Sequence, residues 1–156
     1  MTELTPLMSE TTLYAEDLTP GVVHDLGSYT PSAEEIDAFA QQWDPQGFHI
    51  DEAIASAGHF GGIIASGLHT MAIAQRLMVT GLFKDVAVIA GRSLDVQMIE
   101  PVRPGMTLHG HLEIDEVNLS KPERALIHQR VTLTHDGTTV LTYAGKAYVR
   151  RRPSSS

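Results

Sequence analysis

An aspartate and a histidine, Asp44 and His49, lie five positions apart in the segment WDPQGFHI. A carboxylate and an imidazole that converge on one water can hold it and move its proton, as general acid–base catalysis requires. Proline would end the preceding helix and glycine would let the chain turn back. Aspartate before proline is also common in surface turns. The two residues are therefore either a catalytic pair or part of a surface turn that carries a half-buried histidine.

A second candidate feature follows in the small-residue segment FGGIIASGLHT, which predicts a helix that begins near Ser66 and Gly67. The first N–H groups of a helix have no partner within it and lie at its positive end. The Gly67 N–H could therefore stabilise the oxygen of an acyl thioester as it becomes an enolate. Residues His69 and Thr70 of the first turn could line the same pocket, although helix capping explains Thr70 equally well.

Hydrophobic periodicity predicts the elements that must position these groups. A helix from Ser32 to Asp44 precedes the pair, a short one at 51–57 follows it, and apolar residues surround most of a longer helix at 66–80, which predicts burial on most sides. Alternating patterns predict strands, and Asp136-Gly137 is a strong hairpin signal between the last two. The expected strands are 21–30, about 86–99, 105–119, 124–135 and 138–149.

One strand, then helices, then four strands in a row indicate an α+β fold rather than alternating βαβ units. We expect an antiparallel sheet of about five strands that curls around the long helix. The chain is expected to form a single domain over residues 1–156. Residues 1–12 and 151–156, the latter with the arginines before PSSS, are expected to be flexible tails.

Composition excludes several classes of function. The 156 residues carry a formal net charge of −8, which argues against a broad nucleic-acid surface. No apolar run approaches the roughly 20 residues of a membrane-spanning helix, and no signal peptide is recognisable, so a cytoplasmic location is expected. The absence of cysteine excludes disulfides and thiolate chemistry. His109 and His111 share one strand face, but no further ligands accompany them, so no metal site is predicted.

The long segment from Tyr14 to Leu77, together with PVRPGMTL and LSKPERALI, resembles the MaoC-like dehydratases, the (R)-specific enoyl-CoA hydratase group of the hotdog fold. The resemblance runs from about Leu13 to Val149. Its core is an ordered motif: an aspartate, four residues, a histidine, a second aspartate, and a helix start rich in small residues.

The resemblance implies that Asp44 and His49 are the catalytic pair and that the Gly67 N–H binds the thioester carbonyl. Ser66, His69 and Gln75 are the further substrate-binding candidates, and Gln75 stands where some hydratases have a serine near the pair. The implied reaction is reversible addition of water across the 2,3-double bond of an acyl thioester of coenzyme A or a carrier protein, with no separate cofactor. A dimer is also implied, with the two sheets joined edge to edge and substrate near the subunit interface.

The sequence departs from the family pattern around the aspartate. The family usually has glycine before it and asparagine-proline after it, whereas here Trp43 precedes Asp44 and Pro45-Gln46 follows. Two other functions therefore stay open. One is a hotdog thioesterase in which Asp44 or Glu52 activates water, and the other is a non-catalytic subunit that binds acyl thioesters.

Three basic residues, Arg92, Arg103 and Lys121, could meet the phosphates of coenzyme A. The simpler interpretation is that each of them is a solvated charge on the surface.

Overall fold

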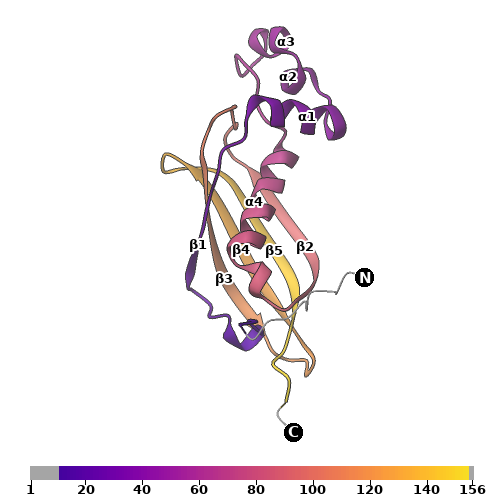
Figure 1. The fold of residues 1–156 in the computed structure, drawn as a ribbon, viewed down its shortest axis with the longest axis vertical. Helices are drawn as coiled ribbons and strands as arrows, with labels where there is room; N and C mark the ends of the chain where they lie inside the picture. Colours follow the sequence, from indigo (N-terminus) through magenta and orange to yellow (C-terminus); the bar gives the residue numbers. More distant parts are fainter. Residues whose placement is uncertain (1–10, 155–156) are drawn as a thin grey trace, which may run out of the picture.

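The computed structural model describes residues 11–154, which build a five-stranded antiparallel sheet with one long helix along its inner face (Figure 1). The strand order is β1-β3-β4-β5-β2, so β1 and β2 form the two edges. This is the hotdog fold, and it confirms the predicted α+β class. The strands are β1 (Val23–Tyr29), β2 (Val88–Met98), β3 (Leu108–Asn118), β4 (Arg124–His135) and β5 (Thr138–Arg150).

The β4–β5 hairpin turns at Asp136 and Gly137, as the sequence predicts. Both residues have positive φ, at 48° and 79°. That combination matches the right-handed twist of the flanking strands and favours aspartate followed by glycine. Next to the turn Thr134 pairs with Thr139, and the register then shifts by one residue of β5. Leu133 therefore pairs with Leu141 and Val131 with Tyr143, and their side chains share the inner face of the sheet.

The long helix α4 (Gly67–Gly81) packs on the inner face of the sheet through Ile73, Ala74, Leu77 and Met78, which are buried. Its opposite side is open, with Leu68 48% and Val79 39% exposed. The prediction of a helix buried on most sides is therefore wrong for the single chain, because the sheet covers one side of α4 only. Within residues 11–154, no helix is long and apolar enough to cross a membrane.

Three short helices gather at the end of the sheet where α4 begins (Figure 1). They are α1 (Ala33–Trp43), α2 (Gly47–Ile50) and α3 (Glu52–Ala57), and two 3-10 turns, η1 (Ala15–Asp17) and η2 (Phe83–Asp85), lie elsewhere. Ser32 caps α1 by accepting from Glu35 N–H at 3.1 Å. Helix α1 ends before Asp44-Pro45, as predicted.

Helix α2 was not predicted, and it changes the role of Gly47. This residue begins α2 and does not have positive φ. A Cβ at position 47 would lie 2.9 Å from the Ile54 side chain. Glycine therefore permits close packing of α2 on α3, and the expectation that it reverses the chain direction is wrong.

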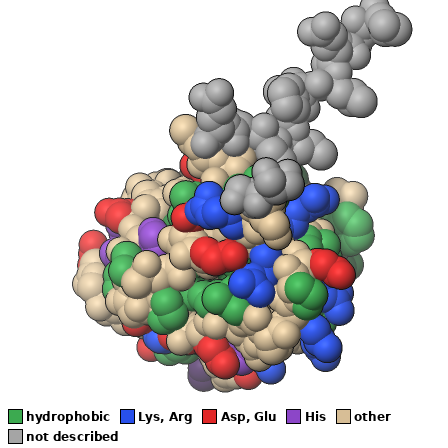
Figure 2. Space-filling view, turned by 90° about the horizontal axis from the view of Figure 1, so that it is seen from below, with side chains coloured by type: hydrophobic (Ala, Val, Ile, Leu, Met, Phe, Trp, Pro, Cys, Tyr) green, Lys and Arg blue, Asp and Glu red, His purple; other side chains and the backbone are tan. Residues whose placement is uncertain are grey.

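The two ends of the described chain meet at the far end of the sheet. Arg151 pairs with Glu16 at 3.3 Å, and Arg152 pairs with Asp17 and stacks on Tyr14. Basic side chains accordingly lie beside acidic ones on this end (Figure 2). Residues 151 and 152 are thus held in place, which corrects the expected tail from 151 onward. The rest of the expected tails falls partly on residues 1–10 and 155–156, which lie outside the described residues.

Candidate active site

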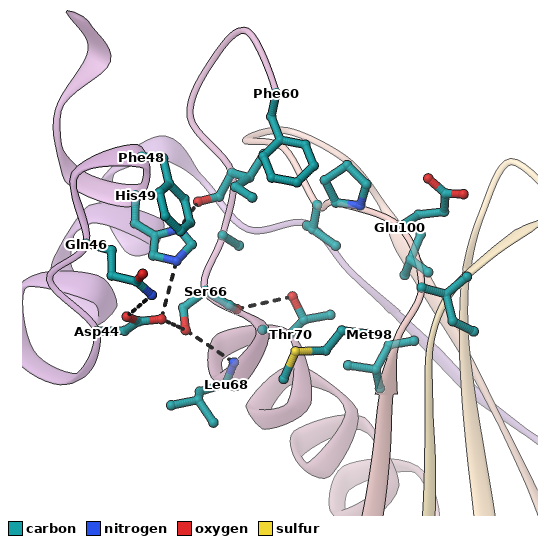
Figure 3. Close-up of a pocket in the computed structure, with 18 residues that line it drawn as sticks. Asp44, Gln46, Phe48, His49, Phe60, Ser66, Leu68, Thr70, Met98 and Glu100 are labelled. Atoms are coloured by element: carbon teal, nitrogen blue, oxygen red, sulfur yellow. Dashed lines mark hydrogen bonds and ion pairs between the residues drawn. The ribbon is translucent and has the colours of Figure 1, made fainter. Parts of the chain in front are cut away.

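A cavity of about 340 Å³ lies at the N-terminal end of α4, between helix α2 and the connection from β2 to β3 (Figure 3). Its walls are mostly apolar, with a small group of polar side chains on one side and Glu100 on the other (Figure 3), an arrangement typical of small-molecule sites. The polar lining includes Asp44, Gln46, His49, Ser66 and Thr70, and the apolar lining includes Phe48, Phe60, Ile64, Leu68, Met98, Ile99 and Val102.

Asp44 and His49 face each other across one corner of this cavity. Asp44 directly follows α1 as its C-cap, His49 lies in α2, and Asp44 Oδ2 is 3.3 Å from His49 Nε2. His49 is only 4% exposed, and its Nδ1 lies 2.6 Å from the backbone oxygen of Ile64. A carbonyl oxygen only accepts, so Nδ1 must carry the proton. In the neutral ring, Nε2 then presents a lone pair toward Asp44.

Two acceptors that face one another leave a place for a shared donor. A water in the cavity beside Asp44 Oδ2 and His49 Nε2 could donate one hydrogen to each. Its oxygen lone pairs would then point away from both groups. The geometry can therefore hold and activate one water molecule.

Two further side chains hold the Asp44 carboxylate. Ser66 Oγ donates to Oδ2 at 2.7 Å, and Gln46 Nε2 donates to Oδ1 at 2.8 Å. The hydrogen bond from Ser66 lowers the pKa of Asp44 most, the one from Gln46 contributes next, and desolvation opposes them with a smaller effect. The carboxylate is therefore ionised at neutral pH, as a base must be.

The variant Ser66→Ala tests this support. Loss of the hydrogen bond from Ser66 should raise the pKa of Asp44, so the acid limb of kcat/KM should move to higher pH than in the parent. The pKa of Asp44 is lower in the folded protein than in the unfolded chain, so the hydrogen bond from Ser66 contributes stability at pH values above the unfolded-state pKa. That contribution is lost as the pH falls through the folded-state pKa. Ser66 also caps α4 by accepting from Leu68 N–H at 3.2 Å, so we expect a loss of about 1 kcal/mol in unfolding free energy.

The pH profile of kcat/KM and thermal unfolding measure the two effects separately. Ser66→Thr, which keeps a hydroxyl, is the matched control. An acid limb that stays in place in Ser66→Ala would show that Ser66 acts only as a helix cap.

Gly67 lines the cavity at the first position of α4. Its N–H makes no hydrogen bond within the described part of the chain, whereas the next N–H is taken by Ser66 Oγ. A Cβ at position 67 would lie 2.1 Å from Met98 Sδ. Glycine therefore leaves room for the flexible Met98 side chain directly beside a free N–H at the positive end of the helix.

Two of the residues predicted to bind substrate lie away from the Asp44–His49 corner. His69 stacks on Phe39, with ring centroids 4.6 Å apart and planes at 8°, so it joins α4 to α1. Burial lowers its pKa. Gln75, two turns further along α4, accepts a hydrogen bond from Tyr143 Oη at 3.1 Å and lines a different cavity. The serine that contacts the pair is Ser66, at the helix start.

Several lining residues were missed from the sequence. Gln46, which interacts with Asp44, carries a local signal, because an amide two residues after an aspartate can fold back onto it. No local sequence signal identifies Phe60, Met98 or the 99–102 segment, because they approach the cavity from distant parts of the chain. Trp43, the departure before Asp44, is 63% exposed and does not line the cavity.

The other charged candidates are dispersed. Arg103 donates to the backbone oxygen of Phe60 at 2.7 Å, which places it beside the cavity wall. Arg92 donates to Tyr148 Oη at 2.6 Å. Lys121 lies between β3 and β4. Glu52 begins α3 and accepts from Ser56, and it does not line the cavity with Asp44.

Comparison with known proteins places this geometry in a family. Residues 19–138 match the MaoC-like domain. An uncharacterized protein, YdeM of Bacillus subtilis, is 38% identical over 100 residues, which is 64% of this chain and 71% of that protein. The crystal structure of a MaoC-like dehydratase from Rhodospirillum rubrum is 37% identical, with a TM-score of 0.83 over 91% of this chain and 99% of that chain.

The (R)-hydratase PhaJ1 of Pseudomonas aeruginosa shares the fold, with 21% identity and a TM-score of 0.72 over 93% of this chain and 96% of that chain. The chain belongs to the MaoC-like domain family, whose match spans both the Asp44–His49 pair and the start of α4. The family resemblance inferred from the sequence is thereby confirmed.

Proposed function

We propose that this protein is a hydro-lyase that adds water reversibly to a 2-enoyl thioester and yields the (R)-3-hydroxyacyl thioester. One observation carries the proposal: Asp44 Oδ2 and His49 Nε2 face each other at 3.3 Å in a cavity that also contains Gly67. The similarity to the Rhodospirillum rubrum MaoC-like dehydratase supports the reaction class.

In the proposed reaction, water held by Asp44 and His49 attacks C3 of the double bond. The electron pair of that bond moves toward the thioester, and negative charge collects on its oxygen. The Gly67 N–H stabilises this oxygen as the enolate forms. The proton that leaves water passes through His49 to C2, so hydroxyl is added at C3 and hydrogen at C2. Dehydration follows the same steps in reverse.

The substrate carrier would be coenzyme A or an acyl carrier protein, and the chemistry needs no cofactor. The cavity supports an acyl group at this position, because apolar side chains form most of its lining. Arg103, beside the cavity wall, could attract the phosphates of either carrier.

Product analysis with crotonyl-CoA tests the function. Hydration gives 3-hydroxybutyryl-CoA, whereas a thioesterase would release free coenzyme A. The thioesterase alternative is less well supported, since Glu52 lies outside the cavity and Asp44 is paired with an imidazole. A protein that binds acyl thioesters without turnover would give neither product.

We also propose that two copies associate along β2. Among the described strands β2 pairs only with β5, and most of its residues are exposed. Open edge strands are normally covered or blocked. A second copy would also bury exposed apolar side chains on β2 and on the open side of α4. These residues are Leu68, Val79, Ile89, Leu94 and Met98. Met98 and Leu68 also line the cavity, so a dimer would bring the site to the interface.

Light scattering at micromolar concentration should give at least twice the mass of one chain. Ile89→Lys, which puts a charge on the exposed part of β2, should shift the mass toward the monomer, because a buried unpaired charge is costly. Val22→Lys, at an exposed apolar position beside the opposite edge strand β1, is the control. A monomeric parent would contradict the proposal.

A further inference from the structure

A groove of about 460 Å³ lies at the end of the sheet where the two ends of the described chain meet (Figure 1). Its lining includes Ile89, Glu123, Arg124, Arg150, Arg151 and Pro153. Leu141, near the start of β5, lines the cavity at Asp44 and His49, whereas Arg150 ends β5 and lines this groove. The two hollows share no lining residue, so the proposed hydration gives the groove no role.

Two of these arginines face each other across the sheet. Arg124 of β4 is the direct cross-strand partner of Arg150 of β5. Both side chains are exposed on the outer face, since their neighbours Ala125 and Val149 are buried on the inner face. Side chains opposite each other in this way have Cβ atoms about 4.5–5.5 Å apart, and like charges there are destabilising. A bound anion would remove this repulsion.

Neither of these two arginines forms an ion pair with a carboxylate within residues 11–154. Carboxylates are not scarce, because the chain has 19 Asp and Glu against 11 Lys and Arg. Arg130, Arg151 and Arg152 all have acidic partners. Glu123 lines the groove, yet it forms no ion pair with the facing arginines. Their two positive charges are therefore left for another anion.

Tyr148, on the same face of the sheet, helps to hold these side chains in place. The Arg124 guanidinium lies over the Tyr148 ring, with Cζ 4.2 Å from the centroid. Arg92 donates to Tyr148 Oη at 2.6 Å and brings a further positive charge. Stacking on a ring uses the face of a guanidinium and leaves the N–H groups at its edge free to donate. An arginine held in this way loses less side-chain entropy when it binds a ligand.

The chemistry of the groove indicates the class of ligand. A guanidinium can donate two parallel hydrogen bonds to one phosphate. Two guanidinium groups on facing positions therefore suit two linked phosphates better than one. Ile89 and Pro153 add apolar surface that a nucleoside can contact. A concave hollow of this size is typical of small-ligand sites, whereas a docking surface for an acidic protein would be flatter and wider.

We propose that Arg124 and Arg150 bind the diphosphate of a nucleoside diphosphate group. Free nucleotides contain this group, and so does coenzyme A. Ile89 of β2 lines the groove and Met98, at the other end of β2, lines the cavity at Asp44. In a two-fold dimer with antiparallel β2 strands, the groove of one copy would lie toward the cavity of the other. The coenzyme A source rests on the proposed function and dimer, whereas the diphosphate site does not.

Calorimetry on the whole protein with ADP, pyrophosphate and inorganic phosphate tests the site. ADP and pyrophosphate should bind more tightly than phosphate. Arg124→Gln and Arg150→Gln should each weaken ADP binding by about tenfold or more, because charge-assisted hydrogen bonds are lost. Glu123→Gln should strengthen it, because a negative charge leaves the groove. Arg130→Gln, at an arginine of the same strand that acids already neutralise, should keep the parental affinity.

Hydration kinetics distinguish the two sources of the diphosphate. A KM for crotonyl-CoA that rises in Arg124→Gln and Arg150→Gln, with kcat kept, identifies coenzyme A, and an unchanged KM identifies a separate nucleotide. If the parent does not hydrate crotonyl-CoA, the reaction class is wrong, while the ADP affinities still decide the site. Failure of the parent to bind ADP at millimolar concentration would overturn the inference. So would an affinity that neither arginine variant changes, because both arginines would then be solvated surface charges.

Discussion

Asp44→Asn should lower kcat/KM for hydration of crotonyl-CoA by roughly 10²- to 10⁴-fold, the usual contribution of a positioned acid–base group. Asparagine keeps the size of the side chain and can still accept from Ser66, whose hydroxyl donates at 2.7 Å in the parent. It does not carry the negative charge that holds and activates water. The effect should therefore fall on turnover while the fold stays intact.

Asp37→Asn is the matched control, because Asp37 is exposed on α1, where its carboxylate accepts from Gln41. Its kcat/KM should stay within about twofold of the parent. Circular dichroism and thermal unfolding of both variants check that the helices near the site are retained. Full activity in Asp44→Asn would end the assignment of Asp44 as the residue that holds and activates water.

His49→Asn should reduce hydration by a similar factor. The asparagine amide can replace Nδ1–H as donor to the Ile64 oxygen, which lies 2.6 Å from Nδ1 in the parent. It removes Nε2, the atom that faces Asp44 and the cavity. The variant thus separates the proton-passing role from the structural hydrogen bond that positions helix α2.

His109→Asn is the control for His49→Asn, since His109 is a partly exposed histidine on β3, outside the cavity lining, that contacts Asp25. It should hydrate crotonyl-CoA at the parental rate. A loss of structure in His49→Asn would instead identify His49 as a packing residue, and the unfolding curve distinguishes this outcome from a loss of chemistry alone.

Local patterns in the sequence were enough to predict most of the fold. Period-two alternation located the last four strands, a short segment before the first helix located β1, and Asp136-Gly137 located the hairpin turn, because these features depend on near neighbours in the chain. The exposure of Leu68 and Val79 was not predictable, because an apolar helix face looks the same whether a sheet or a second copy covers it.

The site was predicted in part for the same reason. Asp44, His49 and Gly67 follow from a motif, and the structure brings all three to one cavity. His69 was expected to line the pocket because it lies in the first turn of the long helix, and Gln75 because it stands where some hydratases have a serine near the pair. The helix turns 100° per residue, which aims His69 at Phe39 and Gln75 at Tyr143 instead.

The motif did not predict the hydrogen bonds that hold the Asp44 carboxylate. Gln46 stands where the family usually has a different residue, yet its amide donates to Asp44 at 2.8 Å. Ser66 reaches Asp44 from 22 positions away in the sequence. Contacts of that kind depend on how α4 packs beside α1 and α2, and the sequence alone does not display it.

The central claim is that Asp44 and His49 act as a unit on one water, and the double variant tests it most directly. We would measure kcat/KM on crotonyl-CoA for the parent, Asp44→Asn, His49→Asn and the combined variant. If both groups hold the same water, the combined loss should lie within a few-fold of the larger single loss, as for residues that act together. Losses that multiply would show that the two side chains act independently, and would contradict a shared water.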